Sequence, residues 1–279
     1  MATPSAKFRS FKKGWPRRAT PTTMLSRAIV KQPCLNFASG ETSVDLGKPD
    51  LEVVLRQHQA YCEALESCGL KLICLPAEDQ YPDSTFVEDT ALLTERGAVL
   101  TRPGATSRID EVESIAPVIR DYFTNIHSID EPGTLDAGDV CEAGDHFFIG
   151  ISRRTNEPGA KQLAHLLQSF GYTTSLIDIR GLSNILHLKS GLAYLSDRRL
   201  VVIDALSNEK EFSGCDLIRL SSTEEYAANC LSLNGQTLIA SGFPTLKREL
   251  ELLGCSIISL NMSEFQKMDG GLSCLSLRF

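Results

Sequence analysis

The sequence contains no C-x-x-C pair, and its nine cysteines are odd in number and irregular in spacing. A structural zinc site and a disulfide framework are therefore not expected. Reduced thiols instead favour a cytoplasmic location. No apolar run approaches the roughly eighteen residues that a membrane-spanning helix needs, so we expect no membrane partner.

Acidic residues are missing from the first 25 residues, which carry six basic ones: Lys7, Arg9, Lys12, Lys13, Arg17 and Arg18. The rest of the chain holds the other 22 basic residues and all 35 acidic ones, a net charge of −13. This acidic body disfavours nucleic acid as a partner and suits a cationic small molecule. The segment 1–25 lacks the apolar stretch of a secretory signal. A transit peptide stays open, but a disordered extension before a start near Met24 is favoured, because no amphipathic period is visible.

A pattern of hairpin, helix and strand recurs about five times after residue 25, without a residue-level repeat. The predicted hairpin strands are 90–94 with 98–102, 139–143 with 146–151, 191–195 with 200–203, and 230–233 with 237–240. The predicted helices are 51–68, 108–122, 157–170 and 246–253, with weaker helical segments at 209–212 and 224–228. The other predicted strands are 27–31, 71–75, 172–177 and 255–260. This period favours a radial or stacked α/β arrangement, and the lack of a Pro/Ser-rich linker predicts one domain over 26–279.

Cys274 stands in the last predicted strand, which follows Asp269-Gly270-Gly271. Alternation along that strand sorts its side chains into an apolar face and a polar face: Leu275, Leu277 and Phe279; Cys274, Ser276 and Arg278. A free cysteine normally packs as a small hydrophobic residue. Because Cys274 shares the polar face, we predict that it faces a cleft and is a candidate nucleophile.

Two pairs of carboxylates stand among small or apolar residues. Glu88 and Asp89 directly precede an apolar strand, and Asp136 and Asp139 belong to the segment Thr134-Leu135-Asp136-Ala137-Gly138-Asp139. For the first pair, a solvated loop and a site around a bound cation are both open, because a cation stabilises an ionised carboxylate that is costly to bury alone. The second pair is by itself more typical of a turn with Asx-type hydrogen bonds.

A histidine and two loop arginines complete the candidates. His187 is flanked by leucines and is by itself more typical of a buried structural histidine than of a catalyst. Arg108 and Arg154 stand in loops that enter helices, where solvent exposure is the default and bidentate binding of a carboxylate is the alternative. Together with Cys274 and the carboxylates, they predict a site for a ligand that is cationic at one end and an amino acid at the other.

A series of motifs runs in order from about residue 26 to the C-terminus: Gly40-Glu41-Thr42-Ser43, Leu46-Gly47-Lys48-Pro49-Asp50, Pro82-Asp83, Phe86-Val87-Glu88-Asp89, Thr101-Arg102-Pro103-Gly104-Ala105, Ser107-Arg108, Thr134-Leu135-Asp136-Ala137-Gly138-Asp139-Val140, Arg154-Thr155-Asn156, Leu186-His187-Leu188-Lys189, Ala227-Ala228-Asn229-Cys230 and Asp269-Gly270-Gly271-Leu272-Ser273-Cys274. In these motifs the chain resembles the dimethylarginine dimethylaminohydrolases, particularly the compact bacterial members. That family belongs to the guanidino-group-modifying (pentein) superfamily. The resemblance implies a five-bladed α/β-propeller of ββαβ-like repeats around a central channel.

The resemblance implies hydrolysis of Nω-methylated arginines to citrulline and dimethylamine or methylamine. In it, Cys274 matches the nucleophile that forms a covalent S-alkylthiouronium, His187 the general acid and base, and Asp136 the carboxylate that orients the histidine. No metal or organic cofactor is implied, and zinc captured by Cys274 and His187 is expected to inhibit. We also predict that a bound cation helps to depress the pKa of Cys274.

The resemblance also implies a set of substrate-binding residues: Glu41, Asp83, Glu88, Asp89, Arg108, Arg154, Met268 and Asp269. Glu88 and Asp89 match carboxylates that hold the guanidinium. Asp83 matches the residue that binds the α-amino group, and Arg108 and Arg154 match the pair that binds the α-carboxylate. Glu41 stands where relatives have an apolar residue and contact the α-amino group through a backbone carbonyl on a mobile loop.

Two alternatives stay open beside the methylarginine hydrolase. One is an arginine deiminase-like or other guanidine hydrolase, although the compact chain leaves no room for the extra helical domain of typical arginine deiminases. The other is a non-catalytic propeller that binds an amino acid, against which the joint presence of Cys274, His187 and Asp136 argues. Whether the chain forms a homodimer also stays open.

Overall fold

The computed structural model of the protein describes residues 24–279. The predicted disordered extension over 1–25 therefore lies outside the described residues, apart from Met24 and Leu25. Within the described part, every helix is too short or too polar to cross a lipid bilayer.

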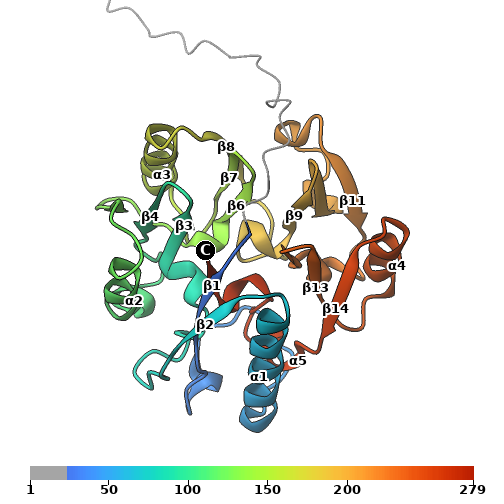
Figure 1. Cartoon of the computed structure of the whole chain (residues 1–279), viewed down its shortest axis with the longest axis horizontal. Helices are drawn as coiled ribbons and strands as arrows, with labels where there is room; N and C mark the ends of the chain where they lie inside the picture. Colours follow the sequence, from blue (N-terminus) through green and yellow to red (C-terminus); the bar gives the residue numbers. More distant parts are fainter. Residues whose placement is uncertain (1–23) are drawn as a thin grey trace, which may run out of the picture.

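Five three-stranded sheets are arranged around a central axis, and Figure 1 looks down that axis. In sheet order they are β15 (Leu277–Arg278), β1 (Arg27–Lys31) and β2 (Lys71–Leu75); β3 (Ala91–Thr94), β4 (Gly97–Leu100) and β5 (Ile126–Ser128); β6 (Val140–Ala143), β7 (His146–Ile151) and β8 (Thr173–Asp178); β9 (Leu192–Ser196), β10 (Arg199–Ile203) and β11 (Asp216–Leu220); β12 (Leu231–Leu233), β13 (Gln236–Ala240) and β14 (Ser256–Leu260). In each sheet the middle strand pairs antiparallel with the first strand and parallel with the third. The fold is a five-bladed α/β-propeller, as predicted.

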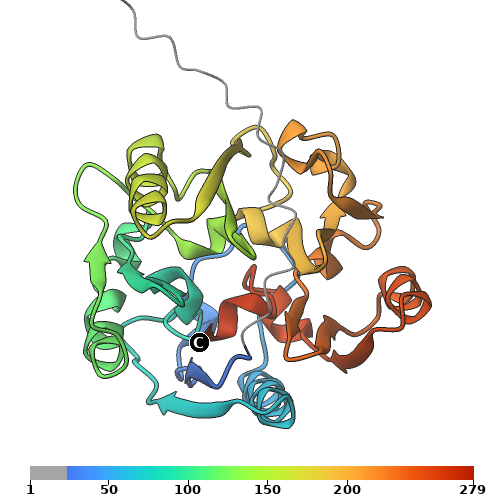
Figure 2. The same ribbon diagram turned by 45° about the horizontal axis from the view of Figure 1, so that its top comes forward.

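Helices connect the parallel strands and lie on the outside of the ring (Figure 2). They are α1 (Leu51–Ser67), α2 (Glu111–Arg120), α3 (Glu157–Ser169) and α4 (Pro244–Leu252), and the short α5 (Ser263–Gln266) follows the fifth sheet. In the described connection between β10 and β11, two 3-10 turns, Asp204–Leu206 and Lys210–Phe212, stand where the other blades have a helix. The weak helical pattern predicted at 209–212 marks one of these turns.

Local sequence explains where these elements begin and turn. The Asp50 carboxylate caps α1 by accepting hydrogen bonds from the backbone N–H groups of Glu52 (2.9 Å) and Val53 (3.2 Å). The predicted hairpin at Asn234-Gly235 has both residues at positive φ (48° and 82°), which is the geometry of a tight two-residue turn that matches strand twist. The sequence therefore sets both the helix start and the strand register here.

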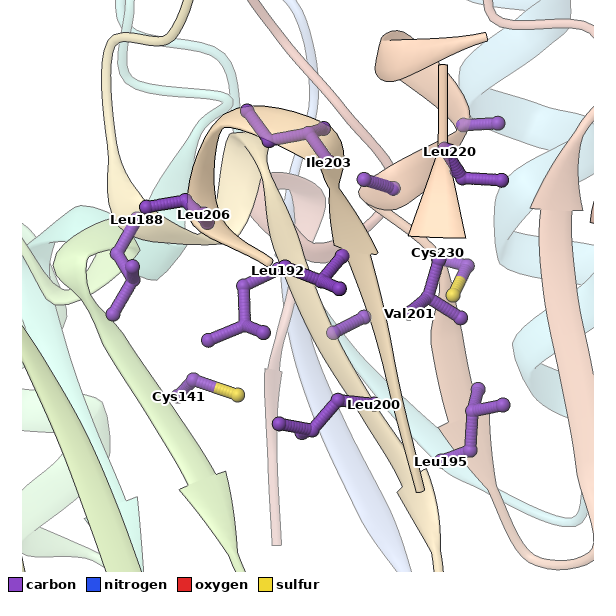
Figure 3. Close-up of a cluster of buried hydrophobic side chains, with 14 of the residues drawn as sticks. Cys141, Leu188, Leu192, Leu195, Leu200, Val201, Ile203, Leu206, Leu220 and Cys230 are labelled. Atoms are coloured by element: carbon purple, nitrogen blue, oxygen red, sulfur yellow. The ribbon is translucent and has the colours of Figure 1, made fainter. Parts of the chain in front are cut away.

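The core lies between neighbouring sheets rather than in a single layer. Four clusters of buried apolar side chains fill these spaces. Figure 3 shows the largest, in which Cys141, Leu200 and Cys230 come from different blades and pack together. Since free cysteine packs as a small hydrophobic residue, Cys141 and Cys230 have structural rather than chemical roles.

A 3-10 turn precedes the first strand of each of the five sheets. These turns are Val87–Thr90 before β3, Ala137–Asp139 before β6, Leu188–Ser190 before β9, Glu225–Ala228 before β12 and Ser273–Leu275 before β15. The turns of neighbouring sheets contact one another in sequence from 273–275 through 87–90, 137–139 and 188–190 to 225–228, so they come together at the centre of the ring. The blade repeat therefore brings side chains that are far apart in sequence to one place.

The prediction of a continuous final strand was wrong. Ser273–Leu275 is a 3-10 turn, and only Leu277–Arg278 forms a strand, which closes the ring by pairing with β1. The expected division into an apolar and a polar face fails, because Ser276 is as fully buried as Leu275. Ser276 and Arg278, two of the three polar side chains of this segment, belong to a hydrogen-bond network with Tyr61 and Glu88.

Candidate active site

Nearly all of the predicted site residues line one cavity. Its lining residues are Glu41, Asp83, Phe86, Asp89, Arg108, Asp136, Arg154, Leu186, His187, Met268, Asp269, Gly270 and Cys274. Phe86, Leu186 and Gly270 had no predicted role, although each belongs to a motif that contains a predicted residue. Of the described residues with a predicted role, Glu88 is the one outside this lining.

Cys274 reaches the cavity from the 3-10 turn before β15. Its thiol accepts a hydrogen bond from the backbone N–H of Gly271, with 3.4 Å between nitrogen and sulfur. The turn is fixed at Ser273, whose backbone N–H donates to Asn229 Oδ1 (2.9 Å). Cys274 is therefore a cavity residue as predicted, but a turn rather than strand alternation directs it there.

Glu88 lies behind that turn and is buried. Its Oε2 accepts a hydrogen bond from the Ser273 hydroxyl (2.7 Å), and its Oε1 lies 2.7 Å from Lys189 Nζ and 3.1 Å from Arg278 Nη2. Arg278 also donates from Nη1 to the backbone carbonyl oxygens of Ser273 (3.0 Å) and Ser276 (2.7 Å). The solvated-loop reading of Glu88 is thus wrong, and this carboxylate joins a network that holds the turn bearing Cys274.

His187 and Asp136 form the predicted pair. His187 Nε2 lies 3.0 Å from Asp136 Oδ2, and the other oxygen, Oδ1, accepts a hydrogen bond from the backbone N–H of Gly104 (2.7 Å). Burial disfavours the imidazolium, but Asp89 and the hydrogen bond to Asp136 outweigh it and raise the pKa of His187 to about 9. His187 is therefore protonated at neutral pH in the ligand-free protein.

Asp139 holds the backbone next to His187. The carboxylate is fully buried and accepts hydrogen bonds from the backbone N–H of Leu188 (2.9 Å) and from the Ser152 hydroxyl (2.6 Å). It thereby fixes the residue that follows His187. The sequence marked Asp139 only as a turn residue, because nothing in its own segment points to a partner 49 positions away.

Asp89 and Arg108 form a buried ion pair at the cavity wall. Asp89 Oδ2 lies 2.6 Å from Arg108 Nη1, and Asp89 Oδ1 accepts a hydrogen bond from the backbone N–H of Gly138 (3.0 Å). A Cβ at position 138 would lie 2.7 Å from that oxygen, so the close approach requires glycine. Arg108 also binds Glu111, which no motif had marked. The solvent-exposed reading of both Asp89 and Arg108 is wrong.

A loop over residues 40–44 covers one side of the cavity. The backbone N–H of Glu41 donates to Asp83 Oδ2 (3.0 Å), and that of Ser43 donates to Asp269 Oδ2 (2.5 Å). Burial raises the pKa of Asp83 despite the proximity of Arg108. Asp269 has a φ of 56°, in the left-handed region that non-glycine residues rarely adopt, and the loop contacts help to hold it there.

Cys274 is protonated in the ligand-free protein. Burial, followed by the charges of Glu88 and Asp89, raises the pKa of its thiol to about 12. The negative groups that hinder the thiolate are also groups that attract a cation. A cation bound in the cavity beside Asp89 and the sulfur therefore favours ionisation of Cys274.

Asp89, Asp136 and His187 place potential metal-ligand atoms within 4.8 Å of one another. Each of these groups already has a protein partner: Asp89 pairs with Arg108, and His187 pairs with Asp136. The grouping is thus accounted for by a hydrogen-bonded acid–base pair beside an ion pair.

Sequence and structure comparisons connect this site to a known family. No model of a protein family matches the chain. The N(G),N(G)-dimethylarginine dimethylaminohydrolase of Pseudomonas aeruginosa is 40% identical over 257 residues, which cover 92% of this chain and 100% of that protein. The chain belongs to the dimethylarginine dimethylaminohydrolase family.

Two further similarities agree with membership in the dimethylarginine dimethylaminohydrolase family. The protein of that name from Streptomyces coelicolor is 33% identical and matches over 90% of this chain and 96% of its own length. A solved structure of a mutant of the Pseudomonas aeruginosa enzyme complexed with citrulline has a TM-score of 0.89, at 40% identity and with 92% of this chain and 100% of that chain covered. The resemblance drawn from the motifs is confirmed, and the roles of individual residues stay predictions.

Proposed function

We propose that this protein hydrolyses Nω-methylated arginines, asymmetric dimethylarginine and monomethylarginine, to citrulline and dimethylamine or methylamine. The observation that carries the proposal is the single cavity that combines Cys274 with the His187–Asp136 pair. The membership in the dimethylarginine dimethylaminohydrolase family supports the same reaction.

The cavity offers complementary groups for both ends of such a substrate. For the guanidinium end of the substrate, the cavity offers the carboxylates of Asp89 and Asp269, which line it together with Cys274. At the other end, Asp83 suits an α-amino group and Arg154 suits an α-carboxylate, because arginine binds carboxylates with two parallel hydrogen bonds. Arg108 already binds Asp89 and Glu111, so we assign it mainly to ordering Asp89. Glu88 acts through the turn that bears Cys274.

The reaction proceeds in two halves. The Cys274 thiolate attacks the central guanidinium carbon, and the carbon–nitrogen bond to the methylated amine breaks as His187 gives its proton to that nitrogen. A covalent S-alkylthiouronium remains on Cys274. The neutral His187 then takes a proton from water, which attacks the same carbon and releases citrulline and the thiolate. Asp136 keeps the histidine oriented and stabilises its protonated form throughout.

The pKa values of the ligand-free protein fit this order of events. His187 holds the proton that the leaving amine needs, because its pKa is raised to about 9. Cys274 is held as a thiol with a pKa raised to about 12 until a cation offsets Glu88 and Asp89. The bound guanidinium is that cation, so Cys274 releases its proton to solvent and the nucleophile forms when its target is in place.

The direct test measures citrulline release from asymmetric dimethylarginine, monomethylarginine, arginine and agmatine under identical conditions. We expect turnover of the two methylated substrates. Turnover of arginine alone would support the arginine deiminase-like alternative, and binding without any turnover would support the non-catalytic propeller. Trapping a mass adduct on Cys274 during turnover, and losing activity in Cys274→Ser, test the covalent step.

We also propose that the protein works in the cytoplasm on a small molecule. All nine cysteines are free thiols, which suits a reducing compartment. The net charge of −13 over residues 26–279 makes nucleic acid an unsuitable partner.

A further inference from the structure

Glu41 binds the arginine that we assign to the substrate carboxylate. Its Oε2 lies 2.6 Å from Arg154 Nη2, and its Oε1 accepts a hydrogen bond from the Ser107 hydroxyl. The hydrogen bond from Ser107, followed by the hydrogen bond and charge of Arg154, holds the pKa of Glu41 below its ordinary value against the opposing effect of burial. The charged carboxylate of Glu41 thus occupies the place on Arg154 that we assign to the substrate carboxylate.

The loop keeps Glu41 in place through its backbone. The Glu41 N–H donates to Asp83, and the neighbouring Thr42 donates from its hydroxyl to the backbone carbonyl of Lys267 (3.1 Å). The Glu41 side chain itself remains 45% exposed, so it can leave Arg154 without losing a buried environment. The contact is therefore ordered and also displaceable.

Because of the charges around the cavity, the contact between Glu41 and Arg154 discriminates between ligands with and without a carboxylate. Five carboxylates line the cavity, those of Glu41, Asp83, Asp89, Asp136 and Asp269, against the cations Arg108, Arg154 and His187. Arg108 and His187 already pair with Asp89 and Asp136. Among the described lining residues, Arg154 is thus the cation that remains for a ligand carboxylate. A carboxylate that binds there competes with Glu41 alone. A ligand that carries an ammonium group but no carboxylate does not enter this competition.

We infer that Glu41 is a specificity-determining residue that competes with the substrate α-carboxylate for Arg154. It weakens the binding of guanidino and ureido amino acids relative to that of the corresponding decarboxylated amines. This inference rests on the proposed function. It adds a second class of ligand for the same cavity, the ω-guanidino amines.

The test compares citrulline with N-carbamoylputrescine, its decarboxylated counterpart, by calorimetric titration. The protein carries Cys274→Ser, so that no turnover interferes, and is used with and without Glu41→Gln. We expect Glu41→Gln to tighten citrulline binding on the order of 10-fold. In this variant the citrulline carboxylate no longer has to displace the charge-assisted hydrogen bond between Glu41 and Arg154. The affinity for N-carbamoylputrescine should not rise.

Glu131→Gln is the matched control. Glu131 lies in a similar exposed ion pair, with its Oε1 2.6 Å from Arg102 Nη2, and outside the cavity lining. This change should leave the ratio of the two affinities as it was.

The outcomes separate the inference from the function. Citrulline affinity that stays constant or falls in Glu41→Gln, while the chain with Cys274 intact still releases citrulline from methylarginine, would overturn the inference alone. A parallel loss of affinity for both ligands would instead make Glu41 a partner of the α-amino group. If citrulline binds to none of the forms and no methylarginine is turned over, the inference falls together with the proposed function.

Discussion

The guanidinium of Arg278 and the carboxylate of Glu88 meet behind the nucleophile's turn, with 3.1 Å between Nη2 and Oε1. Arg278 simultaneously binds two backbone carbonyl oxygens, that of Ser273 at the start of the turn and that of Ser276 directly after it. One side chain therefore links the last strand of the ring, the turn that bears Cys274 and a buried carboxylate. The position of the sulfur depends on this link.

Arg278→Lys should lower kcat on the order of 10²-fold with little change in KM, because a small displacement of a reacting atom has effects of that size. Lysine keeps the charge beside Glu88 but cannot donate simultaneously to two carbonyl oxygens in the fixed fork of arginine. Steady-state kinetics with asymmetric dimethylarginine measures the effect. Arg199→Lys, in β10, is the control and should have ordinary kinetics. An increase in KM at constant kcat would place Arg278 in substrate binding and contradict the positioning role.

Asp136→Asn should shift the alkaline limb of the pH–rate profile to lower pH and reduce kcat on the order of 10²-fold, as expected for impaired general acid catalysis. The pKa of His187 is raised to about 9 in the folded protein, above its ordinary 6.5, partly through Asp136. Loss of that carboxylate lets the pKa fall. The raised pKa also stabilises the fold fully below pH 6.5, and this contribution is lost as the pH rises through 9.

A pH–rate profile of Asp136→Asn that keeps the alkaline limb of the unmodified protein would be incompatible with this account. Asp145→Asn is the control, because Asp145 pairs with Arg96 outside the cavity lining. Thermal unfolding across the same pH range supplies the matching stability measurement.

Alkylation of Cys274 by iodoacetamide should be slow in the ligand-free protein and should rise with pH without a plateau near neutrality. The thiol pKa is raised to about 12, and only the thiolate reacts. Peptide mass spectrometry over a pH series separates Cys274 from the exposed Cys74, which serves as the internal reference. A plateau at neutral pH would mean that the thiolate exists before the substrate binds.

Removal of residues 277–279 should abolish activity and lower the melting temperature strongly. These residues form the closing strand with β1, and the Phe279 carbonyl accepts hydrogen bonds from the backbone N–H groups of Ser26 and Arg27, both 2.8 Å. Leu277→Ala is the informative companion, because it removes a buried side chain, at about 2–5 kcal/mol, and retains Arg278. We expect Leu277→Ala to lose stability but to keep kcat well below its melting temperature. Equal losses of kcat in both variants would contradict a separate role for Arg278.

The sequence by itself determined the repeat and the candidates for chemistry. Hydrophobic alternation, turn pairs such as Asn234-Gly235 and caps such as Asp50 are local signals, so the hairpins and helices of the blades follow from them. The motifs shared with the family were sufficient to single out Cys274, His187 and Asp136. Local patterns failed at the end of the chain, where alternation predicted a continuous strand over residues that form a 3-10 turn.

Only the tertiary structure decided which charges meet. Glu88 and Asp89 are neighbours in sequence, yet one lies behind the Cys274 turn and the other lines the cavity beside Arg108. The contact of Glu41 with Arg154 joins residues 113 positions apart. Such pairs arise because the ring brings five separate turns to one centre, and electrostatic interactions depend on distance in space rather than on position in the chain.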